Sequence, residues 1–184
     1  MSFYYLLNMK KIFYKQHHEN TCGVNAIRTV FYNKFGIKIS ENDFIEKAQK
    51  ILKDKRDGKP LQWNYEILRY GTDIYHFRNM AEHFGLKTFS SSKGKIDDLE
   101  YLINRGNWPI IHRKFEGENE THYLVVHNYD GRNIHLFDPV GENGGLKKED
   151  YDLFYEKWLF ENERWFILFY RKGQLMIPFK GKYL

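Results

Sequence analysis

Cysteine is nearly absent from this sequence: Cys22 is the only one among 184 residues. A single cysteine cannot form an internal disulfide, so the fold must be held together by its core, and a free thiol suits a reducing compartment. No stretch approaches the roughly 18 apolar residues that a membrane helix requires. The short apolar run at residues 1–11 lacks the basic start and the small-residue cleavage site of a signal peptide. We therefore expect a cytoplasmic protein without membrane insertion.

Concentrated charge is also lacking. The 29 Lys and Arg residues outnumber the 24 Asp and Glu residues for a net charge of +5, and acids interrupt the densest basic segment, residues 50–59. A nucleic-acid-binding surface concentrates its basic residues more strongly, so we do not expect nucleic acid as a partner. The chain shows no repeat or linker, and its 18% aromatic residues indicate a packed core. The sequence predicts one domain over residues 1–184 and leaves the oligomeric state open.

Helical periodicity dominates the first half of the chain. Apolar residues recur at spacings of three and four after Cys22, and Gly36 is a typical residue for the end of that helix. Ser40 and Asp43 form a capping signal for a second helix. The elements expected in this half are helices at 22–35, 40–52, 74–84 and 96–104, and a short strand at 87–89.

From Trp108 onward the pattern changes to strands. Asp130-Gly131 is a strong two-residue turn signal between two apolar strands. The elements expected in this half are strands at 109–115, 122–129, 133–137 and 165–170, a polar turn at 116–120, a glycine-rich loop at 141–145 and a helix at 148–158. Helices followed by antiparallel strands predict an α+β fold, in which an N-terminal helical half packs on a C-terminal antiparallel β-sheet.

Cys22 and Gln16 have the spacing of a nucleophile and an oxyanion donor. A cysteine at the beginning of a helix feels the partial positive charge of that end, which favours the thiolate. A lone cysteine is more often a buried hydrophobe, but the polar pair Asn20-Thr21 and the small Gly23 favour a reactive site here. The amide of Gln16, six residues before the cysteine, can donate to an oxyanion together with a backbone N–H near Cys22. We predict these two roles.

His122 and Asp138 are the predicted base and its orienting group. A two-residue turn at Asp130-Gly131 pairs Tyr129 with Arg132, and in that register Asp138 falls within one residue of His122, within reach after a small register shift or bend. The imidazole would then be held in the tautomer that serves the thiol. His127 is the nearest rival, but its odd offset from His122 predicts the opposite sheet face.

A metal site is the alternative use of these residue types. His17, His18 and Cys22 are close in sequence, yet a zinc site needs three or four converging ligands, and neither a second cysteine nor a regular histidine spacing is present. We expect no metal and no organic cofactor.

These motifs resemble those of the papain-like cysteine peptidases that cut bacteriocin leader peptides after a double glycine and are often fused to ABC transporters. The resemblance spans roughly residues 12 to 170. Peptidases of that family usually have Asp directly before the nucleophile, where this chain has Thr21. No transporter sequence follows within the 184 residues, so the resemblance implies a stand-alone member. The segments that carry it are Gln16-x5-Cys22-Gly23, 35–40, 71–72, 84–86, 108–111, 122–126, Asp138-Pro139 and Trp158.

The resemblance implies a cysteine peptidase that acts on a peptide or protein, with leader-peptide processing as one such reaction. Two alternatives stay open. The same thioester chemistry serves papain-like acyltransferases and deamidase effectors, and a non-catalytic peptide-binding module could keep the groove without turnover.

Overall fold

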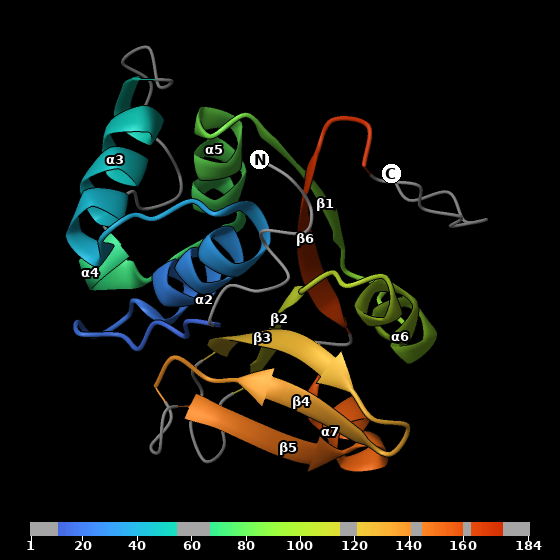
Figure 1. Ribbon diagram of the computed structural model, residues 1–184. Helices are drawn as coiled ribbons and strands as arrows, with labels where there is room; N and C mark the ends of the chain where they lie inside the picture. The colour runs from blue at the N-terminus through green and yellow to red at the C-terminus, as the bar shows by residue number, and fades with distance from the viewer. Residues whose placement is uncertain (1–10, 55–66, 115–120, 141–144, 160–162, 175–184) are drawn as a thin grey trace.

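One antiparallel sheet and the helices on its two faces make up the fold, which is α+β as the sequence predicts (Figure 1). The computed structural model describes residues 11–54, 67–114, 121–140, 145–159 and 163–174. Its helices are α2 (Cys22–Val30), the π-helix η1 (Phe31–Phe35), α3 (Glu41–Asp54), α4 (Ile67–Tyr70), α5 (Ile74–His83), α6 (Ile96–Asn104) and α7 (Tyr151–Lys157). Its strands are β1 (Leu86–Ser91), β2 (Ile110–Lys114), β3 (Thr121–Tyr129), β4 (Asn133–Phe137), β5 (Leu146–Asp150) and β6 (Trp165–Arg171).

The strand order across the sheet is β1-β6-β2-β3-β4-β5, and every neighbouring pair is antiparallel. The helical half therefore contributes one edge strand, β1, to a sheet that otherwise comes from the second half of the chain. The predicted turn at 116–120, the apolar segment at 1–10 and residues 141–144 of the predicted loop lie outside the described residues.

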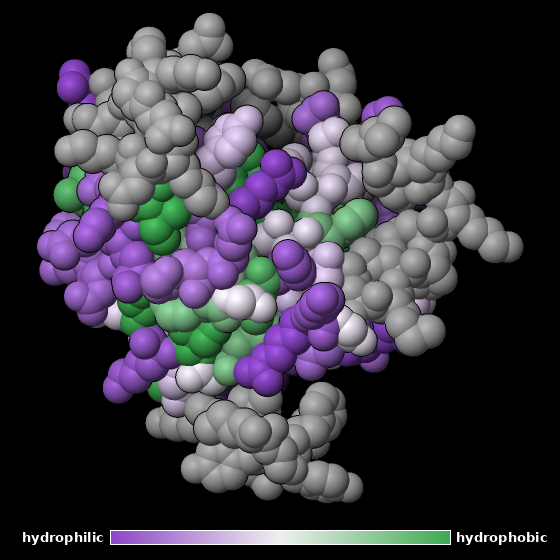
Figure 2. Space-filling view, turned by 90° about the horizontal axis from the view of Figure 1, so that it is seen from above, coloured by the Kyte–Doolittle hydropathy of each residue, from purple (hydrophilic) through white to green (hydrophobic). Residues whose placement is uncertain are grey.

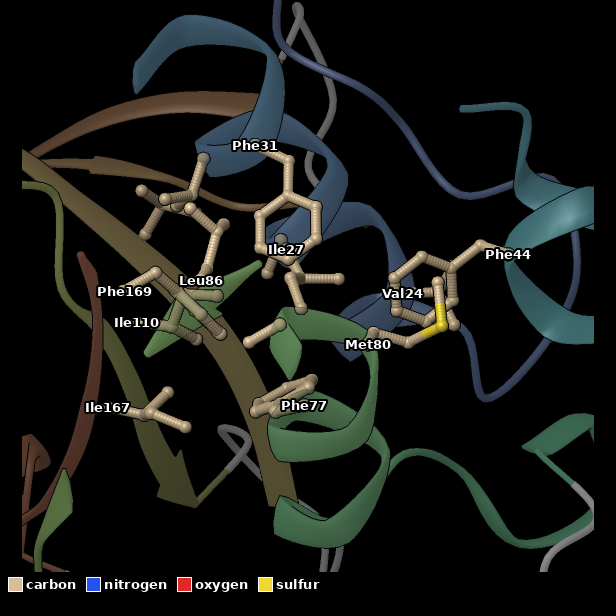
Figure 3. Packing of buried hydrophobic residues seen from close by; sticks show 14 of the residues in the cluster. Val24, Ile27, Phe31, Phe44, Phe77, Met80, Leu86, Ile110, Ile167 and Phe169 are labelled. Atoms are coloured by element: carbon tan, nitrogen blue, oxygen red, sulfur yellow. The ribbon is translucent and has the colours of Figure 1, made fainter. Parts of the chain in front are cut away.

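The helices α2 and α5 pack on one face of the sheet, and α3 packs on these two helices from the outside (Figure 1). Figure 3 shows Ile27 of α2 and Phe77 of α5 directed toward Ile110 and Ile167 of the strands. Phe44 of α3 packs in the same hydrophobic cluster. This packing holds the first turn of α2 against the strands that carry the second half of the site.

The opposite face of the sheet is covered by α6 and α7. Strand residues alternate between the two faces, so Leu124 and Leu136 pack with Leu99 of α6, with Phe154 of α7 and with Trp158, the residue that follows α7. The central part of the sheet is therefore buried on both faces. The sequence pattern predicted a helical layer only on the face that α2 and α5 cover.

The predicted helix at 148–158 is wrong in its first part. Residues 146–150 form the edge strand β5 paired with β4, and α7 begins only at Tyr151. Asp150 explains the boundary, because its carboxylate accepts a hydrogen bond from the N–H of Asp152 at 3.1 Å and caps the helix. The short helix α4 was not predicted.

The predicted hairpin register is also wrong. Tyr129 pairs with Ile134 rather than with Arg132, so the turn is longer than two residues. The Asp130 carboxylate stabilises this longer turn by accepting the backbone N–H groups of Arg132 and Asn133. A register shift between Val126 and Asn128 adds a bulge in β3.

On the face that Figure 2 presents, hydrophilic side chains surround smaller hydrophobic areas. None of the helices in the described ranges has the length and apolar composition needed to cross a membrane.

Substitution of Phe77 tests the packing between α5 and the sheet. It is fully buried, and its ring lies 5.0 Å from that of Tyr123 and 6.3 Å from that of Phe169. We expect Phe77→Ala to lower the free energy of unfolding by about 3–5 kcal/mol, because it leaves a cavity between helix and strands. The measurement is chemical denaturation followed by circular dichroism. Tyr75→Ala, at a half-exposed position of the same helix, is the matched control and should cost under about 1 kcal/mol.

Candidate active site

Cys22 is the first residue of α2, and its side chain is partly exposed. The N-cap residue Thr21 makes no capping side-chain hydrogen bond to the first turn of the helix. The first N–H groups of a helix lack partners within it and attract negative charge. The sulfur therefore lies beside backbone N–H groups that can donate to an oxyanion.

The side chain of Thr21 instead donates a hydrogen bond to the carboxylate of Glu41. Glu41 begins α3 and is 5% exposed. One of its oxygens accepts hydrogen bonds from Thr21 Oγ1 at 2.6 Å and Asn25 Nδ2 at 2.9 Å, and the backbone N–H of His17 lies 3.2 Å from the other. Burial raises the pKa of Glu41, but these hydrogen bonds and the charge of Arg28 outweigh it and leave the pKa lowered.

Gln16 is tethered on both sides. Its own N–H donates to the carbonyl of Pro139 at 3.0 Å, and the N–H of the next residue, His17, is bound by Glu41. The loop from Gln16 to Cys22 therefore runs between the turn after β4 and the start of α3. The Gln16 Oε1 atom is buried and has no hydrogen-bond partner among the described residues. An amide with an unpartnered buried atom is unusual, and such groups are frequent at functional sites.

His122 and Asp138 lie in direct contact. His122 Nε2 is 2.7 Å from Asp138 Oδ1, and both residues are buried. The corrected register explains the contact: Val125 pairs with Phe137, so one step further Asp138 is opposite Leu124, and it shares a sheet face with His122 two residues away. In the two-residue-turn register the two side chains would have pointed to opposite faces.

Cys22 is the second partner of His122. Burial lowers the pKa of His122, but the hydrogen bonds to Asp138 and Cys22 and the charges of both outweigh it and raise the pKa to about 9. Because Asp138 occupies Nε2, Nδ1 is the ring atom that remains for the thiol. The imidazole is therefore a cation at neutral pH and lies beside the Cys22 sulfur.

The Asp138 carboxylate has two further partners. Oδ1 also accepts the N–H of Val140 at 2.9 Å, and Lys147 Nζ lies 2.6 Å from Oδ2. Burial raises the pKa of Asp138, but the hydrogen bonds and charges of His122 and Lys147 lower it well below its usual range. Asp138 is thus a fixed anion at neutral pH.

The rival histidines lie in different surroundings. His127 packs against Phe13 and Trp108, with ring centroids 5.4 and 5.6 Å apart. Burial and neighbouring positive charges lower its pKa to about 4. His112 stacks on Tyr123, and burial and the charge of His122 lower its pKa to about 4 as well. Both rings are neutral at pH 7, whereas His122 is charged and has Cys22 as a hydrogen-bond partner.

Gly23 permits a close approach of three elements beside the nucleophile. A Cβ atom at this position would lie 2.7 Å from Thr72 Cβ and 3.0 Å from Tyr123 Cδ2. Only glycine therefore lets the loop before α5 and strand β3 come this near to the first turn of α2.

The histidines near Cys22 in sequence form no metal site. His18 Nε2 lies 3.1 Å from Asn42 Oδ1, and no group of three His, Cys, Asp or Glu side chains converges as ligands in the part of the chain that the structure describes.

Two residues at the site were not predicted. Glu41 was predicted only as a residue of the helix at 40–52, and Lys147 had no assigned role. No local motif marks either of them, because each depends on a partner in another element.

A family model described as "Peptidase_C39 like family" matches residues 10–168. No curated protein matches the chain.

Solved structures share the fold at low sequence identity. The peptidase domain of Streptococcus ComA, a bifunctional ABC transporter involved in quorum sensing, is 16% identical with a TM-score of 0.60, and the match covers 88% of this chain and 99% of that one. A candidate C39-like peptidase from Bacillus anthracis is 14% identical with a TM-score of 0.65, covering 88% and 95%. A double-glycine-motif protease from an AMS/PCAT transporter, solved with its leader peptide, is 19% identical with a TM-score of 0.53, covering 87% and 91%.

Glu41 supplies a prediction for the pH dependence of stability. Its folded-state pKa is lowered, so its carboxylate stabilises the fold above the ordinary pKa of glutamate, and that contribution is lost as the pH falls through the lowered value. We expect Glu41→Gln to lower the free energy of unfolding at pH 7 by about 1–3 kcal/mol, and by progressively less in acid.

Urea denaturation at a series of pH values measures this difference. Glu46→Gln, at an exposed position of the same helix, is the control and should differ from the parent by less than about 0.5 kcal/mol. A Glu41→Gln deficit that stays constant down to pH 3 would show that the carboxylate charge is not what stabilises this contact.

Proposed function

The chain belongs to the Peptidase_C39-like family, whose members are cysteine peptidases, and we propose that it cleaves a peptide bond through Cys22, His122 and Asp138. The observation that carries this assignment is the position of His122, which has the Asp138 carboxylate on one side and the Cys22 thiol on the other. A nucleophile, a base and an orienting group in mutual contact are what thiol hydrolysis requires.

The first half of the reaction forms a thioester. The Cys22 sulfur attacks the carbonyl carbon of the substrate, and the carbonyl electron pair moves onto oxygen. As the tetrahedral intermediate collapses, the C–N bond breaks and the His122 imidazolium gives its proton to the departing amine. Asp138 stays ionised throughout and holds the ring in position.

The second half releases the acyl group. A water molecule attacks the thioester carbon while neutral His122 accepts its proton, and the C–S bond then breaks to return the thiolate and the imidazolium. Both halves pass through an oxyanion. The donors we assign to it are the Gln16 side-chain amide and a backbone N–H at the start of α2.

The substrate we propose is a peptide or protein, and the reaction class is the processing of a leader peptide. The leader-peptide complex of the double-glycine protease supports a peptide in this fold. We also propose that residues 1–184 act as one domain. We place it in a reducing compartment such as the cytoplasm, where Cys22 is not oxidised.

Cys22→Ala is the direct test of the proposed function. Synthetic peptides with a Gly-Gly pair after an amphipathic leader are incubated with the protein, and the products are identified by mass spectrometry. We expect the parent to cleave them and Cys22→Ala to be slower by at least about 10³-fold, because the covalent route has no other nucleophile.

The same experiment separates the alternatives. Products lengthened by an added amine would identify an acyltransferase, and release of ammonia from glutamine would identify a deamidase. Tight peptide binding without any product would identify a binding module. His18→Ala, at an exposed position, is the control and should keep the activity of the parent.

Gln16→Ala tests the oxyanion assignment. We expect kcat to fall by about 10²–10³, as for removal of a single oxyanion donor, with a much smaller change in KM because the amide acts on charge that develops in the transition state. Steady-state kinetics on a cleaved peptide gives both constants. A raised KM with unchanged kcat would assign Gln16 to substrate binding instead.

A further inference from the structure

The Asp138 carboxylate holds two cations, and the proposed reaction uses only one of them. Oδ1 is occupied by His122 Nε2 and by the N–H of Val140. Oδ2 is occupied by Lys147 Nζ at 2.6 Å, the shortest of the three contacts. Both oxygens of a carboxylate that is 2% exposed are therefore bound, and no rotation of Asp138 could improve its bond to His122 without breaking the one to Lys147.

The fold places Lys147 at this point. Lys147 lies on the edge strand β5 and pairs with Leu136 of β4, two residues before Asp138. Lys147 and Asp138 therefore share a face of the sheet and are diagonal neighbours, within reach of a long side chain. The lysine side chain is 45% exposed, whereas that of Asp138 is 3% exposed, so the cation reaches inward from the rim to a buried anion.

The other charged groups around His122 are already paired or neutral. Arg113, the cross-strand partner of His122, forms a two-pronged ion pair with Glu149 at 2.7 and 2.9 Å. His112 is neutral at pH 7 because its pKa is lowered to about 4. Apart from these, Cys22 faces the ring from α2. Lys147 is thus a second cation bound to the Asp138 carboxylate, beside His122.

We propose that Lys147 is a positioning residue of the active site: it holds the second oxygen of Asp138 and limits how strongly that carboxylate retains the proton of His122. This inference rests on the proposed function, because it concerns the group that must both give up and regain a proton in each cycle.

The restraint matters because His122 is already a strong base. Its pKa is raised to about 9 while Cys22 and Asp138 lie beside it, and an imidazole that holds its proton too firmly is a poor acid toward the departing amine. A second cation on Asp138 disfavours the imidazolium by like-charge repulsion and by sharing the negative charge. Each further unit of pKa would lower the neutral fraction of His122 at pH 7 about tenfold.

The test is a titration of His122 followed by NMR in protein with labelled histidine, with the signal assigned from its loss in His122→Ala. We expect the midpoint in Lys147→Met to lie about 0.5–1 pH unit above that of the parent, since a positive charge has been removed beside the carboxylate. Lys147→Gln is a second neutral variant and should show the same rise. Lys147→Arg keeps the charge and should restore the midpoint of the parent.

Lys148→Met is the matched control. Lys148 is the next residue on β5, lies 3.5 Å from Asp130 and points away from Asp138, so its removal should leave the His122 midpoint unchanged. A midpoint in Lys147→Met that coincides with that of the parent, or lies below it, overturns the inference. The titration needs no substrate, so this outcome is distinct from a failure of peptide cleavage, which would overturn the proposed function while leaving the influence of Lys147 on His122 measurable.

Discussion

Glu41 carries a negative charge into the boundary between α2, α3 and the loop that precedes Cys22. Its two oxygens bind the hydroxyl of Thr21, the amide of Asn25 and the backbone N–H of His17, so one carboxylate connects the residues next to Gln16 and Cys22 with the helix that follows. This anion adds to the direct contacts between the loop and the start of α2, such as that of the Thr21 hydroxyl with the His18 carbonyl. The geometry of the nucleophile and of the assigned oxyanion donor therefore depends on a charge that takes no part in the proposed reaction.

The same carboxylate is informative about the relation to the family. The peptidases that this chain resembles usually have Asp directly before the nucleophile, whereas here Thr21 occupies that position. The hydroxyl of Thr21 lies 2.6 Å from Glu41 Oε1, so a carboxylate is supplied to this point from α3 instead. This chain therefore has a carboxylate beside the residue before Cys22, and that carboxylate comes from the start of α3.

On the sheet side of the site, charged side chains are likewise held by oppositely charged partners. Strand β5 provides Lys147 to Asp138 and, two residues later, Glu149 to Arg113, so alternate residues of one edge strand place opposite charges beneath the predicted base. Two anions, Glu41 on the helical side and Asp138 on the strand side, thus hold the two halves of the site. The hydrogen bond from the Gln16 N–H to the Pro139 carbonyl joins them.

The sequence by itself determined the helix at 96–104, the start of the first helix at Cys22 and the α+β class, and it singled out Cys22, Gln16, His122 and Asp138 as the predicted site. These follow from periodicity, capping and motif spacing, which are local properties of the chain. The sequence did not determine the turn after Tyr129, because the turn residues fit two loop lengths and the Asp130 side chain selects the longer one.

The strand at 146–150 could not be predicted because four of its five residues are charged, and only pairing with β4 makes it a strand. The roles of Glu41 and Lys147 could not be predicted for a related reason. A charged residue is ordinarily a solvated surface group, and what makes these two important is the buried partner that the tertiary structure brings to them. Residue type and spacing can be read from the sequence. The register of the strands and the pairing of charges are decided by packing between different segments of the chain.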